Sequence, residues 1–459
     1  MCGIAGLLGN GSLEDAISMA SAIGHRGPDG SGDFLEDVEQ ANGSVAFSHA
    51  RLSIIDLDGS NQPIYSDHGC VLMVNGEIYN HQKIKSTLRD YPFRTAGDSE
   101  VIMALHRKYS WNQTVGKNPA ERHIEWVSKL DGMWGFSLWD PKAKELILCR
   151  DPFGIKPLVR TQLSDGTLLF ASEVKAFRGH TGFSAKPDIS ALSVRLAYEY
   201  PLDQTTLFQG VTSVGIGTIE TWSLVEGKAT LTGVAKYWKP RVIPSENWSP
   251  STNASQLLNS LSDSIQDRLM ADVPVGIVLS GGLDSSLMAA LANDTADSAG
   301  KPTPECWTVA DSEENVDLQA SIMVTKNHDL GHHVHIMDEN TMWKKLPEFV
   351  WNGEDLDITV MFWQSVFEQM KGNVTVALCG QGADELHAGY SRYRALTEHS
   401  NVVKSRLSLA GQISISENDR GLGKPWSSDS IMPEDNFANL SDTLEFEQSR
   451  GQMSNFQLR

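Results

Sequence analysis

The chain has 459 residues, of which 40% are hydrophobic and 21% charged, a composition typical of a globular protein with two or three domains. The net charge of -20 argues against nucleic-acid binding, which normally needs a basic face, but does not exclude a small anionic substrate. Five scattered cysteines, no signal peptide and no apolar run near the roughly 18 residues of a membrane span predict a cytoplasmic protein without disulfides or membrane contact.

The first part of the chain mixes strand-like and helix-like segments. Apolar runs predict strands, and helical periodicity predicts two helices between them. The strands are expected over 2–8, 45–55, 71–79, 133–138 and 145–149, and the helices over 13–22 and 99–109. The last two strands flank Asp140-Pro141-Lys142, a typical hairpin turn. We therefore expect antiparallel sheets covered by helices.

Cys2 would carry two reactive groups if Met1 were removed. Its α-amino group, with an ordinary pKa near ~8, could then take the thiol proton around neutral pH. One residue would thus supply both nucleophile and base. The alternative is a small apolar residue at the start of a strand, which is the commoner role of a buried cysteine.

Three other stretches favour the catalytic interpretation. Arg51 lies at the edge of an apolar strand, Asn75, Gly76 and Glu77 end another strand, and Asp98 begins a helix. Arg51 could bind an α-carboxylate, while Glu77 and Asp98 could face an ammonium group. The Asn75 amide and the Gly76 N–H could donate to a developing oxyanion. Together they predict a site for an amino acid.

These motifs resemble the glutaminase domain of class II glutamine amidotransferases, an αββα sandwich with the N-terminal-nucleophile fold. The resemblance covers nearly all of residues 2–201 and rests on 2–4, 25–30, 51–57, 75–80, 98, 150–158 and 170–173. It implies that Cys2 attacks the side-chain amide of L-glutamine, forms a γ-glutamyl thioester and releases ammonia, with Asn75 and Gly76 as the oxyanion hole. The glutamine-binding residues that it implies are Arg51, Leu52, Ile54, Ile55, Asn75, Gly76, Glu77 and Asp98.

Residues 202–250 lose helical periodicity and are predicted to be a linker that contains a hairpin over 218–224 and 229–232. From residue 251 onward, strands and helices alternate, which predicts a doubly wound parallel sheet with ligands at the carboxyl ends of its strands. The strands are expected over 273–279, 305–310, 332–337 and 374–378, and the helices over 257–268, 284–294 and 317–329.

Two of these strands end in glycine loops. Ser280 to Ser286 links a strand to a helix N-terminus, where backbone N–H groups commonly bind phosphate. The loop lacks the Gly-Lys-Ser/Thr ending of a Walker motif, and its alternative role is a turn capped by Asp284 or Ser285. The second loop, Cys379 to Leu386, contains Asp384. We predict that Asp284 and Asp384 hold Mg²⁺, the alternative for Asp384 being a favourable charge at a helix start.

This half resembles the synthetase domain of glutamine-hydrolysing asparagine synthetase, an ATP-pyrophosphatase fold, over about residues 251–393. The resemblance implies that ATP and Mg²⁺ activate a carboxylic acid acceptor as an acyl-adenylate, which ammonia then attacks. The ATP-binding residues that it implies are Leu279, Ser280, Gly281, Gly282, Asp284, Ser285, Ser286, Val309, Cys379 and Gly380.

Two departures from the family concern the acceptor. Gln381 stands where the family has a carboxylate at the adenylation site, which brings aspartate into question as the acceptor. The apolar-periodic stretch from Leu440 has no helix stop before Arg459, so domain 251–459 is either truncated or has a differently built acceptor pocket.

The sequence therefore predicts an ATP-dependent amide ligase that hydrolyses glutamine and forms AMP and pyrophosphate, as in asparagine biosynthesis. One alternative is an enzyme of specialised metabolism that amidates another carboxylate or transfers another nitrogen nucleophile. The other is a degenerate binding or regulatory protein that has lost synthesis. The expected partners are L-glutamine and the acceptor acid, and a homodimer is an assembly that the resemblance leaves open.

Overall fold

The computed structural model describes residues 1–38, 41–110, 118–198, 201, 204–239, 249–337, 339–354, 361–387, 389–390, 398, 401–402 and 404–406. The chain forms two compact units, one built on Met1–Pro240 and the other on Arg241–Gly389. The C-terminal stretch from Leu440, which carried an expectation of truncation, lies outside the described residues. None of the helices that the described residues form is long and apolar enough to cross a membrane.

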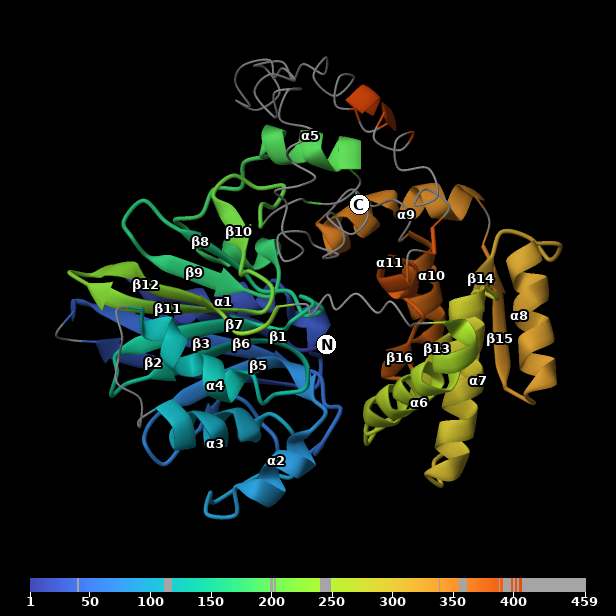
Figure 1. Ribbon diagram of the computed structural model, residues 1–459. Helices are drawn as coiled ribbons and strands as arrows, with labels where there is room; N and C mark the ends of the chain where they lie inside the picture. The colour runs from blue at the N-terminus through green and yellow to red at the C-terminus, as the bar shows by residue number, and fades with distance from the viewer. Residues whose placement is uncertain are drawn as a thin grey trace. The chain divides into compact units, whose positions relative to one another are not determined.

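The first unit contains two six-stranded sheets, with strand orders β10-β8-β9-β1-β3-β2 and β12-β11-β7-β6-β5-β4 (Figure 1). The strands of the first sheet are β1 (Gly3–Gly9), β2 (Gly30–Val38), β3 (Gly43–Arg51), β8 (Val159–Gln162), β9 (Leu168–Ala171) and β10 (Val211–Ser213). Those of the second are β4 (Ile64–Tyr65), β5 (Val71–Ile78), β6 (Gly132–Asp140), β7 (Glu145–Arg150), β11 (Thr218–Val225) and β12 (Lys228–Lys236). All pairings in both sheets are antiparallel.

Helices cover the outer faces of the two sheets. They are α1 (Leu13–Ser21), α2 (His81–Thr87), α3 (Glu100–Tyr109) and α4 (Ile124–Val127). The unit also contains α5 (Ile189–Tyr198) and the 3₁₀ turns η1 (Gly24–Arg26), η4 (Pro119–His123) and η5 (Val174–Gly179). One apolar cluster joins the inner faces of the two sheets, a second joins α1 and η5 to the first sheet, and a third joins α3 and α4 to the second sheet. The layers therefore run helix, sheet, sheet, helix, which confirms the predicted αββα class.

Strand β1 shows why the sequence builds this sandwich. Its side chains alternate between faces, so Ile4 and Leu8 enter the core between the sheets while Ala5 and Leu7 pack under α1. Every residue of the strand is buried, which explains its unbroken apolar run. Gly6 is required because the Phe170 ring lies 2.4 Å from where a Cβ would stand. This central strand fixes the position of Cys2 directly before it.

The second unit is a four-stranded sheet with order β15-β14-β13-β16 and only parallel pairings. Its strands are β13 (Val275–Val278), β14 (Glu305–Ala310), β15 (His332–Ile336) and β16 (Val376–Leu378). Its helices are α6 (Pro250–Arg268), α7 (Leu283–Ser298), α8 (Val316–Asn327), α9 (Glu339–Gly353), α10 (Met361–Met370) and α11 (Ala383–His387).

Helices cover both faces of this sheet. Apolar side chains of α6, α7 and α8 pack on one face, and Val366 and Met370 of α10 pack on Val278 and Trp307 of the other. The predicted doubly wound parallel sheet is thus confirmed. The chain runs outward from β13 to β15 and then returns beside β13 as β16, so the order reverses between β13 and β16. Ligands of open α/β sheets bind at such a reversal, beyond the carboxyl ends of the strands.

Three expected segments differ from the structure. The strand predicted over 45–55 ends at Arg51, because the chain turns there and Leu52 bonds to Cys2 instead of to a neighbouring strand. The hairpin expected over 218–224 and 229–232 forms as β11 and β12, but it extends the second sheet of the first unit, with β11 pairing to β7, and is not a separate linker element. Helix α6 begins at Pro250 and not at 257, because the Ser249 side chain caps its first turn and proline is favoured there.

Candidate active sites

Cys2 lies half-buried at the edge of β1 and contacts the loop that follows β3. Its Sγ lies 3.4 Å from the Leu52 N–H, which donates to it, and 3.5 Å from the Leu52 carbonyl oxygen. Burial raises the pKa of the thiol. The α-amino group of Met1 is also enclosed, and burial lowers its pKa to about 5. An amine in this position is therefore neutral at pH 7 and able to accept a proton.

A buried ion-pair network holds the backbone at Cys2. The Arg26 Nε donates to the Cys2 carbonyl oxygen at 3.0 Å, and its Nη1 lies 2.5 Å from a Glu173 carboxylate oxygen. The other oxygen of Glu173 lies 2.5 Å from the Lys175 Nζ and 3.2 Å from the His25 Nε2. Burial alone would raise the pKa of Glu173, but the His25 hydrogen bond and the two cations lower it to about 2. The loop and turn at 25–30 thus position the N-terminus.

Arg51 organises the loop that follows its strand. The side chain is buried, and its guanidinium donates to the carbonyl oxygens of Asp56 and Leu57 and to the Asn61 side chain at 2.7–3.1 Å. Within the described part of the chain, no carboxylate forms an ion pair with Arg51. Its charge therefore remains for a ligand, while Leu52, Ile54 and Ile55 lie half-buried on the same loop.

Asn75 lies on β5 and is fully buried. Neither its amide nitrogen nor its amide oxygen has a hydrogen-bond partner among the described residues. An unpaired buried polar group costs about 1–3 kcal/mol, so its retention calls for a functional reason. Gly76 follows, and a Cβ there would stand 2.3 Å from the Met133 carbonyl oxygen, so only glycine fits beside β6. The end of β5 thus places an amide group without a partner among the described residues next to a glycine, whose backbone carries no side chain.

The carboxyl groups of Glu77 and Asp98 are neighbours. Asp98 is buried and accepts from the Ile78 N–H at 2.6 Å, which ties the start of α3 to the end of β5. Burial and the nearby Asp98 raise the pKa of Glu77. The Glu77 charge also raises the pKa of the Cys2 thiol and the Lys156 charge lowers it, so both groups lie within electrostatic range of Cys2. A cationic ammonium group would neutralise this carboxyl pair.

In the second unit, the loop after β13 is braced from inside. Gly281 has a φ of 82°, and a Cβ there would lie 2.2 Å from the Asp317 carbonyl oxygen. The Ser285 Oγ accepts from the Ser280 N–H and lies 2.9 Å from the Ser280 Oγ, so both hydroxyls hold the loop in shape. The Ser286 Oγ is buried and has no partner among the described residues.

The second loop packs directly on the first. A Cβ on Gly380 would stand 3.0 Å from the Ser285 nitrogen, which shows how closely the two backbones approach. Burial, followed by the Asp384 charge, raises the pKa of Asp284. Two adjacent carboxylates at the reversal of the sheet are oxygen ligands of the kind that Mg²⁺ prefers, so these residues fit that ion.

Both loops line a cavity of about 320 Å³ in the second unit. The predicted residues that line it are Leu279, Ser280, Gly282, Asp284, Ser285, Val309, Gly380, Gln381 and Asp384. Gly281, Ser286 and Cys379 do not, although all three belong to the same two loops. The rest of the lining consists of Thr308 and an apolar wall of Val278, Trp307, Trp363 and Val366. A cavity with an apolar wall and a polar loop edge suits a ligand with a flat ring and a phosphate chain.

Comparison with known proteins separates the chain into the same two parts. Residues 1–238 match the family model of the glutamine amidotransferase domain, and residues 256–456 match that of asparagine synthase. The chain belongs to the glutamine amidotransferase domain family. The two matches in this order make it asparagine-synthetase-like, which confirms the resemblance that the motifs indicated.

Curated relatives extend over most of this chain. A putative glutamine-hydrolysing asparagine synthetase of Mycobacterium bovis is 32% identical over 424 residues, which are 86% of this chain and 61% of the relative. The glutamine-hydrolysing asparagine synthetase 1 of Bacillus subtilis is 30% identical over 86% of this chain and 60% of its own length. Amidase chry2 of Gibberella zeae is 29% identical over 83% and 56% respectively. The chain spans about three-fifths of the length of these relatives.

Sequence reasoning missed several residues at both sites. Lys156 is buried, and its charge affects the pKa values of Cys2 and Glu77, although the motif over 150–158 gave it no role at the site. Its signal was a lysine inside an apolar context after the Asp151 turn, whose carboxylate accepts from the Lys156 N–H at 2.9 Å. Trp307 and Trp363 could not be found from spacing, because tertiary packing alone brings their strand and helix to the cavity.

Proposed function

We propose that this chain hydrolyses glutamine at Cys2 and uses the ammonia in an ATP-dependent reaction that turns a carboxylic acid into an amide. The observation that carries the proposal is the buried Asn75 amide without a partner, on the strand whose Glu77 acts on the Cys2 thiol. Support comes from the amidotransferase match around this site and the asparagine synthase match around the cavity of the second unit.

At the first site, removal of Met1 would give Cys2 a free α-amino group next to its own Sγ, and at an ordinary pKa of ~8 part of this amine is neutral at pH 7. That neutral amine takes the thiol proton as Sγ attacks the glutamine amide carbon, and the proton then passes to the departing ammonia. The Asn75 amide and the Gly76 N–H stabilise the oxyanion. Water hydrolyses the thioester to release glutamate.

The remaining groups of the first site bind the amino-acid end of glutamine. Arg51, which has no carboxylate partner in the described chain, takes the α-carboxylate. Glu77 and Asp98 face the ammonium group, whose charge favours ionisation of a carboxyl pair that burial otherwise keeps protonated. Binding of the substrate thereby completes the electrostatics of the site.

At the second site, the backbone of the Ser280 to Gly282 loop would hold the phosphates of ATP, and the apolar wall with Trp307 would contact the base. Mg²⁺ held by Asp284 and Asp384 would neutralise phosphate charge. The acceptor carboxylate attacks the α-phosphorus of ATP, pyrophosphate leaves, and ammonia displaces AMP from the acyl-adenylate to give the amide.

Gln381 favours an acceptor other than aspartate as a second candidate. Gln381 lines the same cavity as Asp384, and the resemblance led us to expect a carboxylate at its position. A neutral amide cannot balance a cationic amino group, so an acid without an α-ammonium group suits the position better. The substrate would then be a simple carboxylic acid, and the enzyme would belong to specialised metabolism.

The test supplies the full chain with glutamine, ATP and Mg²⁺, together with aspartate or one member of a panel of unsubstituted carboxylic acids. AMP, glutamate and a new amide in equal amounts are expected with at least one acid. Asparagine would identify aspartate as the acceptor. Glutamate release without AMP for every acid would reject amide synthesis and support the degenerate binding protein.

A further inference from the structure

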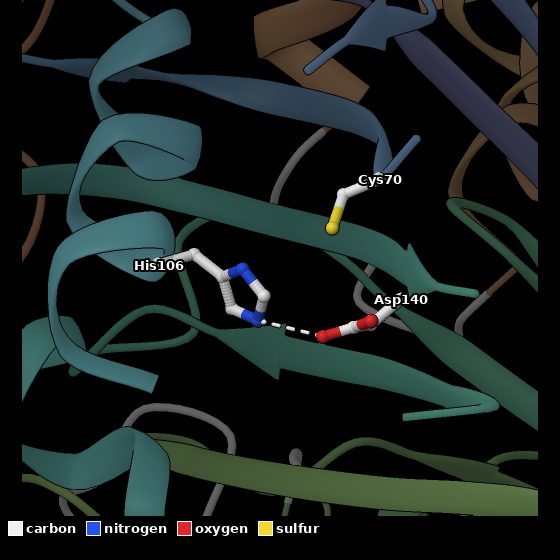
Figure 2. Close-up of side chains that lie close together, drawn as sticks. All are labelled: Cys70, His106 and Asp140. Atoms are coloured by element: carbon white, nitrogen blue, oxygen red, sulfur yellow. Dashed lines mark ion pairs between the residues drawn. The ribbon is translucent and has the colours of Figure 1, made fainter. Parts of the chain in front are cut away.

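Three side chains that the proposed chemistry does not use converge inside the first unit. Cys70, His106 and Asp140 are each no more than 3% exposed. Their Sγ, imidazole nitrogen and carboxylate oxygen all lie within 4.8 Å of one another, and the His106 Nε2 stands 3.5 Å from an Asp140 oxygen. Figure 2 shows the three side chains pointing toward a common centre.

The second sheet and its covering helix create this convergence. Val71 pairs with Trp139 across β5 and β6, so the next positions along the two strands are Cys70 and Asp140. Side chains at directly opposite positions of an antiparallel pair lie about 5 Å apart on the same face. His106 reaches that face from α3, which packs on this sheet. Backbone geometry therefore sets the spacing of all three donors.

We propose that Cys70, His106 and Asp140 bind one Zn²⁺ ion that stabilises the glutaminase unit. Thiolate, imidazole and carboxylate are the three protein ligand types of zinc, at about 2.0–2.3 Å from the metal. Ligands on a tetrahedron of that size stand about 3.3–3.7 Å apart, so the 3.5 Å between His106 and Asp140 already fits. The fourth position is left for one water molecule.

Charge balance favours a dication in this place. Binding removes the proton of the Cys70 thiol, which leaves to solvent, and forms a bond from Sγ to the metal. Thiolate and carboxylate then offset the two positive charges, so the buried site is neutral overall. A buried charge without such compensation is costly. Asp140 keeps its other contacts, because its second oxygen accepts from the N–H groups of Lys142 and Ala143 at 3.0 Å.

The ion would have a structural role. Cys70 lies five residues before Asn75 on the same extended chain, a separation of roughly 17 Å at about 3.3 Å per residue. It would therefore take no part in the reaction at Cys2. It would join the start of β5 and the end of β6 to α3. Strand β5 carries Asn75 and Gly76, and Asp98 lies just before α3. The inference is independent of the proposed function, since metal content and unfolding can be measured without any substrate.

The experiment uses the full chain without a histidine tag, produced with added zinc and dialysed against a weak chelator. We expect about one zinc per chain by elemental analysis, as for a structural site. Cobalt reconstitution should give visible d–d bands and a near-ultraviolet charge-transfer band from the thiolate. The variant C70S should lose the charge-transfer band and at least ~10-fold in affinity.

Two variants separate metal loss from general damage to the core. C149S alters another fully buried cysteine of the same sheet outside the cluster, and it should bind zinc like the wild type. D140N keeps an oxygen that can accept from Lys142 and Ala143, yet it should bind less zinc. Zinc should raise the Tm of the wild type and C149S but not of C70S. The proposal would be overturned if the wild-type chain contained no zinc, or if the cobalt-loaded wild-type chain showed no thiolate charge-transfer band.

Discussion

The two candidate sites differ in how much of their structure exists before a ligand arrives. Asn75, Asp98 and Arg51 are each at most 7% exposed, and the last two are held by several hydrogen bonds. In the cavity of the second unit, Ser280 and Gln381 are exposed and Asp284 and Asp384 are only half-buried. The proposed glutamine site is therefore preorganised, while the proposed nucleotide site depends more on its ligands.

This difference has an electrostatic consequence. Burial shifts the pKa values of Cys2, Glu77, Asp98 and Lys156, so the charges of the first site are set by their neighbours. In the second site the raised pKa of Asp284 owes a share to Asp384, a repulsion that a divalent cation removes. Substitutions should therefore act through electrostatics already present at the first site and through ligand binding at the second.

The largest effect is expected for Cys2→Ala. Removal of the nucleophile should lower glutamine hydrolysis by at least ~10⁴-fold, since no other group can form the thioester. Amide formation from added ammonia should continue, because the second unit is intact. Glutamate release and AMP formation are measured in parallel, with Cys149→Ala as a buried control. Undiminished hydrolysis in Cys2→Ala would refute the assignment of the nucleophile.

Asn75→Ala should lower kcat for glutamine hydrolysis about 10²- to 10³-fold, the usual loss for one oxyanion donor. The free energy of unfolding should change by less than ~1 kcal/mol, because the amide has no partner to lose in the described chain. Ser137→Ala on β6 removes a different buried polar group, a hydroxyl without a partner in the described chain, and serves as the control. A strongly destabilised Asn75→Ala with normal kcat would make the amide structural instead.

Asp284→Asn should lower ATP-dependent amide formation about 10²-fold by weakening the metal site, with glutamine hydrolysis retained. The control is Asp294→Asn, an exposed position on the same helix α7. Activity is measured over a Mg²⁺ titration, in which the first variant should need more metal. Equal metal dependence in both variants would exclude Asp284 as a ligand.

Glu173→Gln should show the smallest effect, a loss of stability that depends on pH. The folded-state pKa of Glu173 is lowered from 4.5 to about 2, so its contribution is present above pH 4.5 and disappears as the pH falls toward 2. We expect a loss on the order of 2 kcal/mol at pH 7, after a discount for remaining solvent contact.

Denaturant unfolding of Glu173→Gln and wild type at pH 7 and near pH 2 checks this expectation. The difference between the two proteins should shrink at the lower pH. A difference that stays constant with pH would show that the carboxylate charge contributes nothing through Arg26, Lys175 and His25.

The sequence alone was sufficient to predict where the local motifs lie in the fold. The run at Asn75 to Glu77 and the loop at Ser280 to Ser286 each combine a strand end with glycine, and the structure places both at strand ends. The sequence was insufficient where a residue joins the site only because folding buries it there. Lys156 became part of the first site only because the Asp151 turn folds against β6, where Asp151 accepts from the Trp134 N–H.

The hydrogen-bond partners of hydroxyl groups could not be predicted from the sequence either. Ser285 was expected to bind phosphate, yet its hydroxyl already bonds within the loop, and its role toward a ligand remains a prediction. The sequence pattern indicated that Ser285 lies in a loop, but it did not show which group its hydroxyl bonds to. The hydrogen-bond partner is set by the loop conformation, which the positive φ of Gly281 permits.

The most direct measurement follows the nitrogen atom itself. The full chain is supplied with glutamine labelled at its side-chain amide nitrogen, ATP, Mg²⁺ and the acceptor panel, and the products are analysed by mass spectrometry. The account predicts a labelled product amide formed in step with AMP, and no label transfer in Cys2→Ala. Labelled ammonia in solution, with no labelled amide and no AMP for any acid, would contradict it.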